Sequence, residues 1–140
     1  MQGGTKEELI YIAGFFDGDG CVSVSQRSLI VNIGNTVKEP LVLVHRFFGG
    51  NITEYQPKGN RQLTYTWTVY GNNAEDFLKY VLPYLIIKKR VAILGLELQT
   101  IPFSNSKRDS IIDEIHELNR RGKKEYLFKL MEESPKKKVV

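Results

Sequence analysis

The sequence has little cysteine and no long hydrophobic run. Its 140 residues include one cysteine, Cys21, which excludes an internal disulfide framework and a zinc site built from several cysteines. No apolar stretch reaches the roughly 18 residues of a membrane-spanning helix, and the N-terminus lacks the basic segment that opens a secretory signal. We therefore expect an intracellular protein with no membrane partner, located in the cytoplasm of a prokaryote or in an organelle and not secreted.

Composition and charge leave the class of protein broad. Hydrophobic residues make up 41% and charged residues 26% of the chain, which is typical of a globular protein and not of a disordered or fibrous one. The length predicts a single domain over residues 1–140, with a helical, basic tail from about residue 123 to 140. Eight basic and three acidic residues lie from Arg120 onward, whereas the first 119 residues hold twelve basic and thirteen acidic. The net charge of +4 does not by itself identify a nucleic-acid partner.

The hydrophobic periodicity predicts alternating helices and strands. A capping box from Thr5 to Glu8 starts a helix that continues to Phe16. Strict alternation predicts strands over 21–27, 29–34, 52–56 and 63–69, and helical spacing predicts helices over 40–48, 73–82, 85–101, 110–118 and 125–132. The predicted fold class is mixed α/β, in which a helix–strand–strand unit repeats and a four-stranded antiparallel sheet is backed by helices.

One face of the predicted sheet is a row of polar side chains. Two interpretations remain open from the pattern alone. The face is either an ordinary solvated surface or one that contacts hydrogen-bonding groups such as base edges.

The segment Asp17-Gly18-Asp19-Gly20 follows the first helix directly. A calcium loop of the EF-hand type is excluded, because the fifth and twelfth positions counted from Asp17 are Cys21 and Ser28. A dinucleotide fingerprint is excluded because it requires a strand before the glycines and a helix after them. An Asp-Gly turn without chemistry stays open.

Small residues on the first helix favour a further alternative. Gly14 and Gly18 are four residues apart beside Ala13, a spacing that lets a second backbone come close. Two copies of the helix packed there would bring two Asp19 side chains together, and like charges so close require a cation. Paired carboxylates with magnesium are an arrangement that cleaves phosphodiesters.

Residues Leu9 to Gly20, with the sequence LIYIAGFFDGDG, closely resemble the motif of the LAGLIDADG homing endonucleases. The Ala-Gly pair, both acidic positions and the final glycine match, while Ile12, Phe15 and Phe16 are apolar variants. The helix–strand–strand repeat, the chain length and Gly49-Gly50-Asn51-Ile52 extend the resemblance over most of residues 5–100. A single motif implies a chain that acts as a homodimer.

The resemblance implies a role for several residues near the motif. Asp19 would bind the divalent metal, Mg²⁺ with Mn²⁺ able to substitute, and the carbonyl of Gly18 would assist. Asn35, after the second strand, would hold the attacking water, and Lys88 would place positive charge beside the phosphate. Asp17 would be structural, and the dimer interface would consist of Ala13, Gly14, Asp17 and Gly18.

The resemblance further implies that the sheet lies along the major groove of double-stranded DNA. The residues expected to face DNA are polar or basic and lie on the strands, the second hairpin and a basic cluster: Ser23, Ser25, Arg27, Asn32, Lys38, Gln56, Lys58, Arg61, Gln62, Thr64, Thr66, Lys89 and Arg90.

The leading function is a site-specific double-strand DNA endonuclease, intron- or intein-associated, that cleaves a long pseudo-palindromic target by metal-assisted hydrolysis. The alternative is a protein on the same scaffold that does not cleave, either an RNA maturase or a DNA-binding regulator. The presence of both Asp19 and Lys88 favours the enzyme, and RNA is the less favoured partner. A generic oligomeric α/β protein would leave the polar face and the acidic helix end unexplained.

Overall fold

The computed structural model describes residues 4–59 and 62–133, with side chains as far as Arg120. Helix α1 (Lys6–Asp19) leads into strands β1 (Gly20–Ser25) and β2 (Ser28–Asn35). Helix α2 (Glu39–Phe48) then leads into β3 (Asn51–Tyr55) and β4 (Thr64–Tyr70). The predicted repeat of a helix and two strands is therefore confirmed. The chain continues through α3 (Gly71–Val81), a short 3₁₀ turn η1 (Leu82–Tyr84), α4 (Lys89–Gln99) and α5 (Lys107–Glu133).

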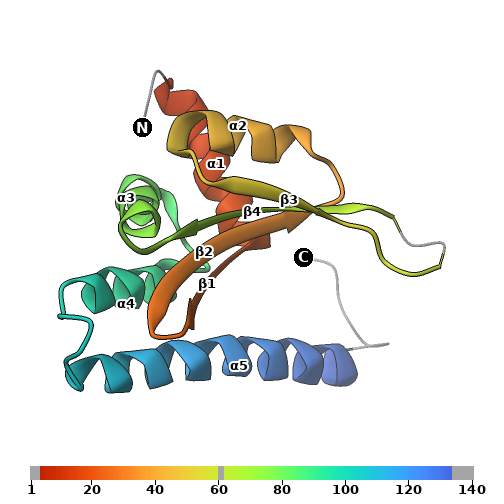
Figure 1. The fold of residues 1–140 in the computed structure, drawn as a ribbon. Coiled ribbons are helices and arrows are strands. Elements are labelled where there is room, and N and C mark those ends of the chain that lie inside the picture. Colours follow the sequence, from red (N-terminus) through yellow and green to blue (C-terminus); the bar gives the residue numbers. More distant parts are fainter. Residues whose placement is uncertain (1–3, 60–61, 134–140) are drawn as a thin grey trace.

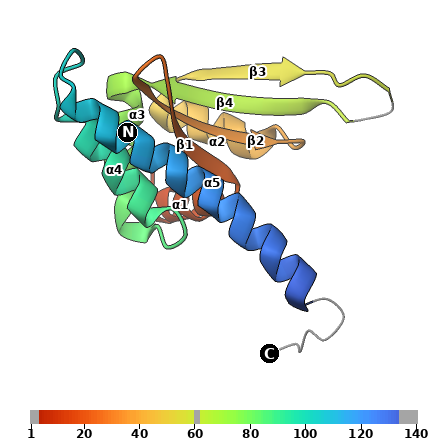
Figure 2. The same cartoon turned by 90° about the horizontal axis from the view of Figure 1, so that it is seen from below.

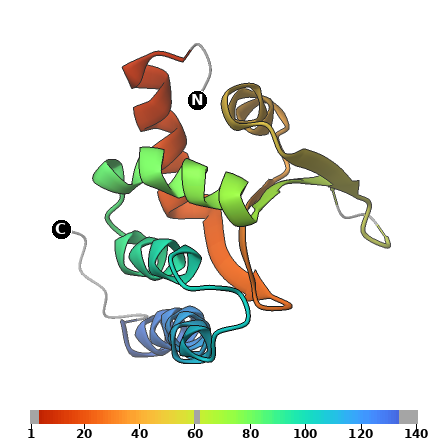
Figure 3. The same cartoon turned by 60° about the vertical axis from the view of Figure 1, so that its left-hand side comes forward.

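The four strands form one antiparallel sheet in the order β1-β2-β4-β3. The two hairpins thus meet at β2 and β4, in the middle of the sheet. Helices α1, α3 and α4 lie on the same side of the sheet (Figure 3), and α2 runs beside α1 (Figure 1). The predicted fold class, a four-stranded antiparallel sheet backed by helices, is confirmed.

The core lies between the sheet and these helices. Alternate strand residues point into it, and Val22, Val31, Ile33 and Trp67 are each at most 1% exposed. The Trp67 indole nitrogen donates to the carbonyl of Gly49 at 2.7 Å, which fixes the link between α2 and β3 against the middle of the sheet.

Helix α5 covers the free edge of β1. The Asn119 amide donates to the carbonyl of Val22 at 3.0 Å, and Ile115 is fully buried in the same core. Figure 2 shows α5 passing β1 and projecting beyond the strands at its C-terminal end. An edge strand exposes unpaired backbone groups, so α5 protects the sheet from pairing with other chains.

Several predicted boundaries are wrong. The helices predicted over 110–118 and 125–132 are one helix, because α5 runs unbroken from Lys107 to Glu133. Gly122 lies between the two predicted ranges and does not end the helix, since one internal glycine costs only about 1 kcal/mol among good helix formers. Helix α5 therefore crosses the predicted start of the tail at residue 123, and the rest of that tail, 134–140, lies outside the described residues. Helix α3 begins at Gly71 with Tyr70 as its N-cap, before the start predicted at residue 73.

Candidate functional site

The C-terminal end of α1 meets the end of β2. Gly20 pairs with Ile33, so the first residue of β1 lies beside the end of β2, two residues before Asn35. The Asn35 amide donates from Nδ2 to Oδ2 of Asp19 at 3.2 Å, and its Oδ1 accepts from the backbone N–H of Val37 at 2.8 Å. Because Val37 occupies the acceptor, the donor is directed at Asp19. The structure thus brings together two of the predicted catalytic residues that are 16 positions apart.

Asp17 points in the opposite direction, into the protein, and only 8% of it is exposed. Its carboxylate accepts three backbone N–H groups, from Ile86 and Ile87 at 3.0 Å and from Lys88 at 2.9 Å. Lys88 is the N-cap residue of α4. Asp17 therefore ties the end of α1 to the start of α4, which agrees with the structural role predicted for it.

The electrostatics of Asp17 follow from these contacts. Burial raises the pKa of its carboxyl, but the three backbone donors and the charge of Lys88 outweigh burial and leave the pKa below its ordinary value of 3.8. Asp17 is therefore ionised at neutral pH and already accepts three hydrogen bonds from the backbone. An occupied carboxylate is a poor choice for binding a metal, whereas Asp19 is exposed.

Lys88 lies at the same helix end. Its ammonium Nζ donates to the backbone carbonyl of Asp17 at 2.7 Å, two residues before Asp19 in the sequence. Carbonyl groups at a helix C-terminus carry partial negative charge, which attracts a cation. Asp19, Asn35 and Lys88 therefore converge on the last turn of α1.

The glycines of α1 and β1 differ in whether the surrounding structure requires them. A Cβ on Gly20 would lie 2.1 Å from the ring of Phe16, so the close turn from helix to strand requires glycine there. A Cβ on Gly14 or Gly18 would meet nothing within 4 Å, and both residues are exposed. Nothing inside the chain therefore requires glycine at positions 14 and 18.

The predicted interface residues divide into two groups. Ala13 is fully buried in the core and Asp17 is nearly so, so neither is a surface position of α1. Of the four predicted interface residues, only Gly14 and Gly18 lie on the exposed side of α1, and the dimer contact itself stays a prediction. Beside them the structure exposes Ile10 at 43% and Tyr11 at 52%.

Two further apolar residues at this surface were missed. Ile86 and Ile87 are 85% and 75% exposed, and their backbones are held against α1 by Asp17. The sequence was interpreted as helical from Leu85, but α4 begins only at Lys89. No local signal sets them apart from the helical pattern that follows, because their exposure depends on the contact of their backbones with Asp17.

The sheet has one open face. Register places Cys21, Asn32, Thr68 and Asn51 side by side in one row across the sheet, and Gly34, Thr66 and Thr53 in another. These rows alternate with the buried ones, so they lie on the face opposite the core. Of the residues expected there, Ser23, Asn32, Thr64 and Thr66 are half-buried, while Ser25 and Gln62 are exposed.

The basic and amide residues that were predicted to contact DNA from outside the strands differ in their surroundings. Lys38 is exposed, with its ammonium 5.6 Å from the ring centre of Tyr65. Gln56, Lys58 and Lys89 are exposed, and Arg61 lies outside the described residues. Arg90 forms an ion pair with Glu114 of α5 at 2.6 Å.

Arg27 does not lie where the alternation predicted. Strand β1 ends at Ser25, and Arg27 sits in the following turn with a φ of 66°. Its guanidinium forms an ion pair with Asp109 and donates to the carbonyls of Phe103 and Asn105. The period of two ends with the strand, so Arg27 contacts the α4–α5 connection instead of extending the open face.

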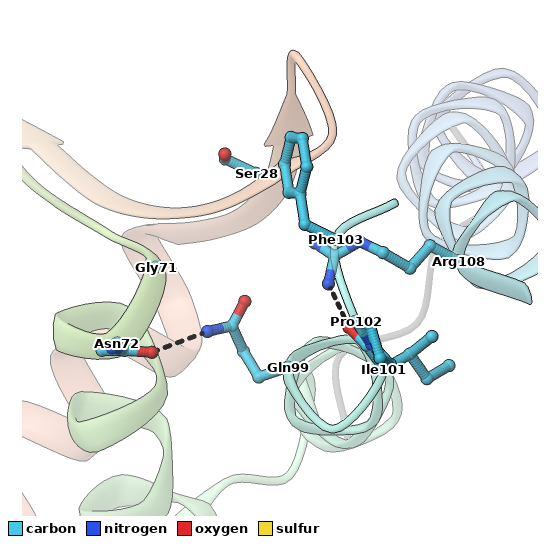
Figure 4. Close-up of a pocket in the computed structure, with 8 residues that line it drawn as sticks. All are labelled: Ser28, Gly71, Asn72, Gln99, Ile101, Pro102, Phe103 and Arg108. Carbon is cyan, nitrogen blue, oxygen red and sulfur yellow. Dashed lines mark hydrogen bonds between the residues drawn. The ribbon is translucent and has the colours of Figure 1, made fainter. Parts of the chain in front are cut away.

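A pocket of about 410 Å³ lies at the other end of β2 from Asn35. Figure 4 shows its lining, which comes from β2, α3, α4, α5 and the α4–α5 connection: Ser28, Gly71, Asn72, Gln99, Ile101, Pro102, Phe103 and Arg108. None of these side chains is a carboxylate. The pocket is therefore distinct from the acidic helix end and does not suit a divalent metal.

The donor chemistry at the helix end fits a hard cation. The Asp19 carboxylate and the Gly18 carbonyl are oxygen ligands, which Mg²⁺ prefers. Among residues 4–59 and 62–133, no group of three His, Cys, Asp or Glu side chains could enclose a metal ion. One chain therefore offers an open, partial ligand set, in keeping with the one or two carboxylates by which Mg²⁺ is usually bound beside a phosphate.

Comparison with known proteins now identifies the family. Residues 6–82 match the LAGLIDADG-like domain. The chain belongs to this family. The matched region includes α1, the whole sheet and α3, and therefore Asp19 and Asn35. No curated protein matches the chain.

Solved structures share the LAGLIDADG fold. The homing endonuclease I-CvuI, crystallised with its target and Ca, is 23% identical with a TM-score of 0.59, and the match covers 80% of this chain and 82% of that one. A second structure of I-CvuI, with another target and Mg and with the DNA not cleaved, has 22% sequence identity and a TM-score of 0.58. The match covers 79% of this chain and 76% of that one. The archaeal intron-encoded homing endonuclease I-Vdi141I, complexed with DNA, has 21% sequence identity and a TM-score of 0.53. The match covers 79% of this chain and 97% of that one.

No helix within 4–59 and 62–133 has the length and apolarity needed to cross a membrane.

Proposed function

We propose that this chain is a site-specific DNA endonuclease that works as a homodimer and hydrolyses phosphodiester bonds with a divalent cation, Mg²⁺ or Mn²⁺. The observation that carries the proposal is the convergence of Asp19, Asn35 and Lys88 at the C-terminal end of α1, where β2 also ends. An exposed carboxylate can hold a cation, an oriented amide can position a water molecule, and an ammonium can offset charge on a phosphate. The I-CvuI and I-Vdi141I structures, solved with DNA, support the choice of substrate.

Each residue has a task that its contacts suit. Asp19, with the Gly18 carbonyl, would hold the cation, which lowers the pKa of bound water and offsets the charge that develops on the phosphate. Asn35 holds the Asp19 carboxylate in place and offers a polar group for a water molecule. Lys88 adds positive charge next to the scissile phosphate.

DNA would lie along the open face of the sheet. The rows of Asn, Thr and Ser side chains offer donors and acceptors to base edges in the major groove, where the four base pairs are distinguishable. Exposed lysines at the periphery, such as Lys58 and Lys89, would contact phosphates and fix the register without reading sequence.

The homodimer would form through the exposed face of α1. Gly14 and Gly18 leave room for a second backbone, and Ile86 and Ile87 present apolar side chains beside them. Packing two copies there would bury these side chains and bring the two Asp19 residues near the symmetry axis. Each Asp19 would then serve one DNA strand.

Cleavage of a random-sequence DNA library tests the proposal. With Mg²⁺ or Mn²⁺, sequencing of the product ends should recover one long, nearly palindromic site, and a chelator should abolish cutting. Asp19→Asn should lower the cleavage rate by at least about 1,000-fold and leave specific binding within about three-fold, because binding depends on the sheet and phosphate contacts.

The matched control is Asp17→Asn, which removes a carboxylate two residues away that faces the interior. It should reduce stability and leave cutting by the folded protein largely intact. Wild-type cutting by Asp19→Asn would show that the metal site is misplaced. Specific binding without cutting by the wild type in either metal would favour a DNA-binding regulator, and selective binding of structured RNA would favour a maturase.

A further inference from the structure

The pocket of about 410 Å³ at the start of β2 (Figure 4) has a buried positive charge in its wall. Arg108 lines it and is only 4% exposed. Its terminal nitrogens donate to the carbonyls of Leu98 and Ile101 at 2.8 Å and of Arg27 at 2.6 Å. Among the residues that the structure describes, its Nε has no hydrogen-bond partner. The three carbonyls are neutral and do not balance the charge, and a buried charge is costly unless an opposite charge accompanies it.

A second arginine lies beside this one. The guanidinium carbons of Arg108 and Arg27 are 5.3 Å and 5.8 Å from the ring centre of Phe103, which also lines the pocket. Burial, and then the charge of Arg27, lower the pKa of the Arg108 guanidinium. The Asp109 carboxylate pairs with Arg27, and none of the residues lining the pocket is acidic. The charge around the pocket is therefore positive.

Helix α3 begins at the same pocket. Gly71 and Asn72, its first two residues, line the pocket. The helix is 11 residues long, its first turn has no acidic residue, and no side chain within the described part of the chain caps it. The first N–H groups of a helix have no partner inside the helix and carry partial positive charge, which favours an anion. Asn72 accepts from Gln99 through Oδ1 at 3.3 Å, so its Nδ2 is the group that can donate to a ligand.

We propose that this pocket binds a phosphate group, which accepts hydrogen bonds from the first turn of α3, from Asn72 and from the Ser28 hydroxyl and balances the charge of Arg108. A phosphate carries up to two negative charges and three strong acceptor oxygens, which suits donors that come from several elements. The group belongs either to a small phosphorylated molecule or to the backbone of bound DNA. Only the second source rests on the proposed function, because the pocket lies at the other end of β2 from Asn35.

Titration of the full chain with inorganic phosphate tests the proposal, with sodium chloride of equal ionic strength as the reference. Calorimetry should show saturable binding of one phosphate per chain. Tm should rise by roughly 5–10 °C at about 100 times the dissociation constant. Arg108 also holds three carbonyls, so its removal would disturb the fold, and Asn72 is the better position for a variant.

Asn72→Asp keeps the acceptor for Gln99 and replaces the donor by a negative oxygen at the start of α3. The fixed charge should raise Tm without phosphate by roughly 2–5 °C and weaken phosphate binding by at least about ten-fold. The matched control is Asn73→Asp, since Asn73 is exposed in the same turn and does not line the pocket. It gains the same interaction with the helix dipole and should bind phosphate as wild type does.

An equal response of all three proteins, or a rise in Tm that does not saturate, would be the general effect of phosphate on protein stability and would overturn the proposal. Loss of phosphate binding in Asn73→Asp as well as in Asn72→Asp would also overturn it, because the site would then not be this pocket.

A second arm distinguishes the two sources of the phosphate. Binding of the target duplex is measured without divalent metal, in phosphate and in chloride of equal ionic strength. A backbone phosphate in the pocket predicts duplex binding about ten-fold weaker in phosphate, whereas a small phosphorylated ligand predicts equal affinities. A chain that binds phosphate but no DNA would overturn the proposed function alone, and one that cuts DNA without saturable phosphate binding would overturn this proposal alone.

Discussion

Two carboxylates separated by one glycine have opposite environments at the end of α1. Asp17 is buried and holds three backbone N–H groups, whereas Asp19 is exposed and contacts one amide. The geometry of the helix accounts for the difference, because residues two apart lie on opposite faces. One carboxylate is therefore committed to the fold, and the other remains available to chemistry.

Asp17 should make stability depend on pH. Its pKa is lowered in the folded chain, so its contribution is present above the unfolded value of 3.8 and is lost as pH falls through the lower, folded value. At pH 7 we expect Asp17→Asn to lower the free energy of unfolding by about 2 kcal/mol. Urea unfolding of both proteins from pH 7 down to pH 2 measures this.

The difference between wild type and Asp17→Asn should shrink below about pH 4. Asp19→Asn, which removes an exposed carboxylate of the same helix, is the control and should change stability little at any pH. A constant difference from pH 7 to pH 2 would mean that Asp17 acts through packing and not through its charge.

Helix α1 has a buried apolar face and an exposed face that carries two glycines. Leu9, Ile12 and Phe16 are at most 8% exposed and pack in the core. Gly14 and Gly18 lie on the outer side, where internal glycine costs helix stability. The two glycines leave open space on the outer face, and the proposed dimer rests on that space.

Gly14→Leu should block that contact while the chain stays folded. A side chain at position 14 meets open space inside the chain, so leucine should not disturb the core, but it would overpack an interface built on close backbone approach. Sedimentation at micromolar concentration should show a dimer for wild type and a monomer for Gly14→Leu, with native circular dichroism in both.

Val42→Leu provides the control for that experiment, since Val42 is 47% exposed and belongs to α2, not to the face of α1 that carries Gly14 and Gly18. It should remain a dimer. A monomeric wild type that cuts both strands of its target would contradict the proposed interface.

The sequence predicted most elements because local signals agreed with tertiary packing. The capping box at Thr5 and Glu8 is present as expected, and alternation in 63–69 matches the buried Trp67 and Val69. The failures have tertiary causes. Asp17 keeps residues 86–88 out of α4, and the contact between α5 and β1 supports a helix through Gly122.

The candidate site was partly accessible to sequence reasoning. Asp19 and Asn35 were each identified from the motif and the strand end, but their contact depends on the β1–β2 register. Arg27 was predicted on the outer face of the first strand, but the strand ends at Ser25, and the alternation of side chains does not extend into the turn that follows. Ile86 and Ile87 could not be recognised as exposed without knowing that Asp17 binds their N–H groups.

At the scale of the whole molecule, the proposed function makes one chain half of a cleavage centre. It carries one motif and one exposed carboxylate at the end of α1, and its open sheet face would cover half of a long target. A homodimer would double each of these and match a nearly palindromic DNA site by its own symmetry. The central claim is thus that two copies each cut one strand.

A mixed dimer tests this claim most directly. Wild type and Asp19→Asn chains, co-expressed with two different affinity tags and purified through both, form dimers with one intact carboxylate. On supercoiled plasmid with the target and Mg²⁺, such dimers should accumulate nicked circles, while wild-type dimers give linear DNA and Asp19→Asn dimers leave the plasmid intact. Linear DNA from the mixed dimer at the wild-type rate, or no cutting at all, would contradict the account.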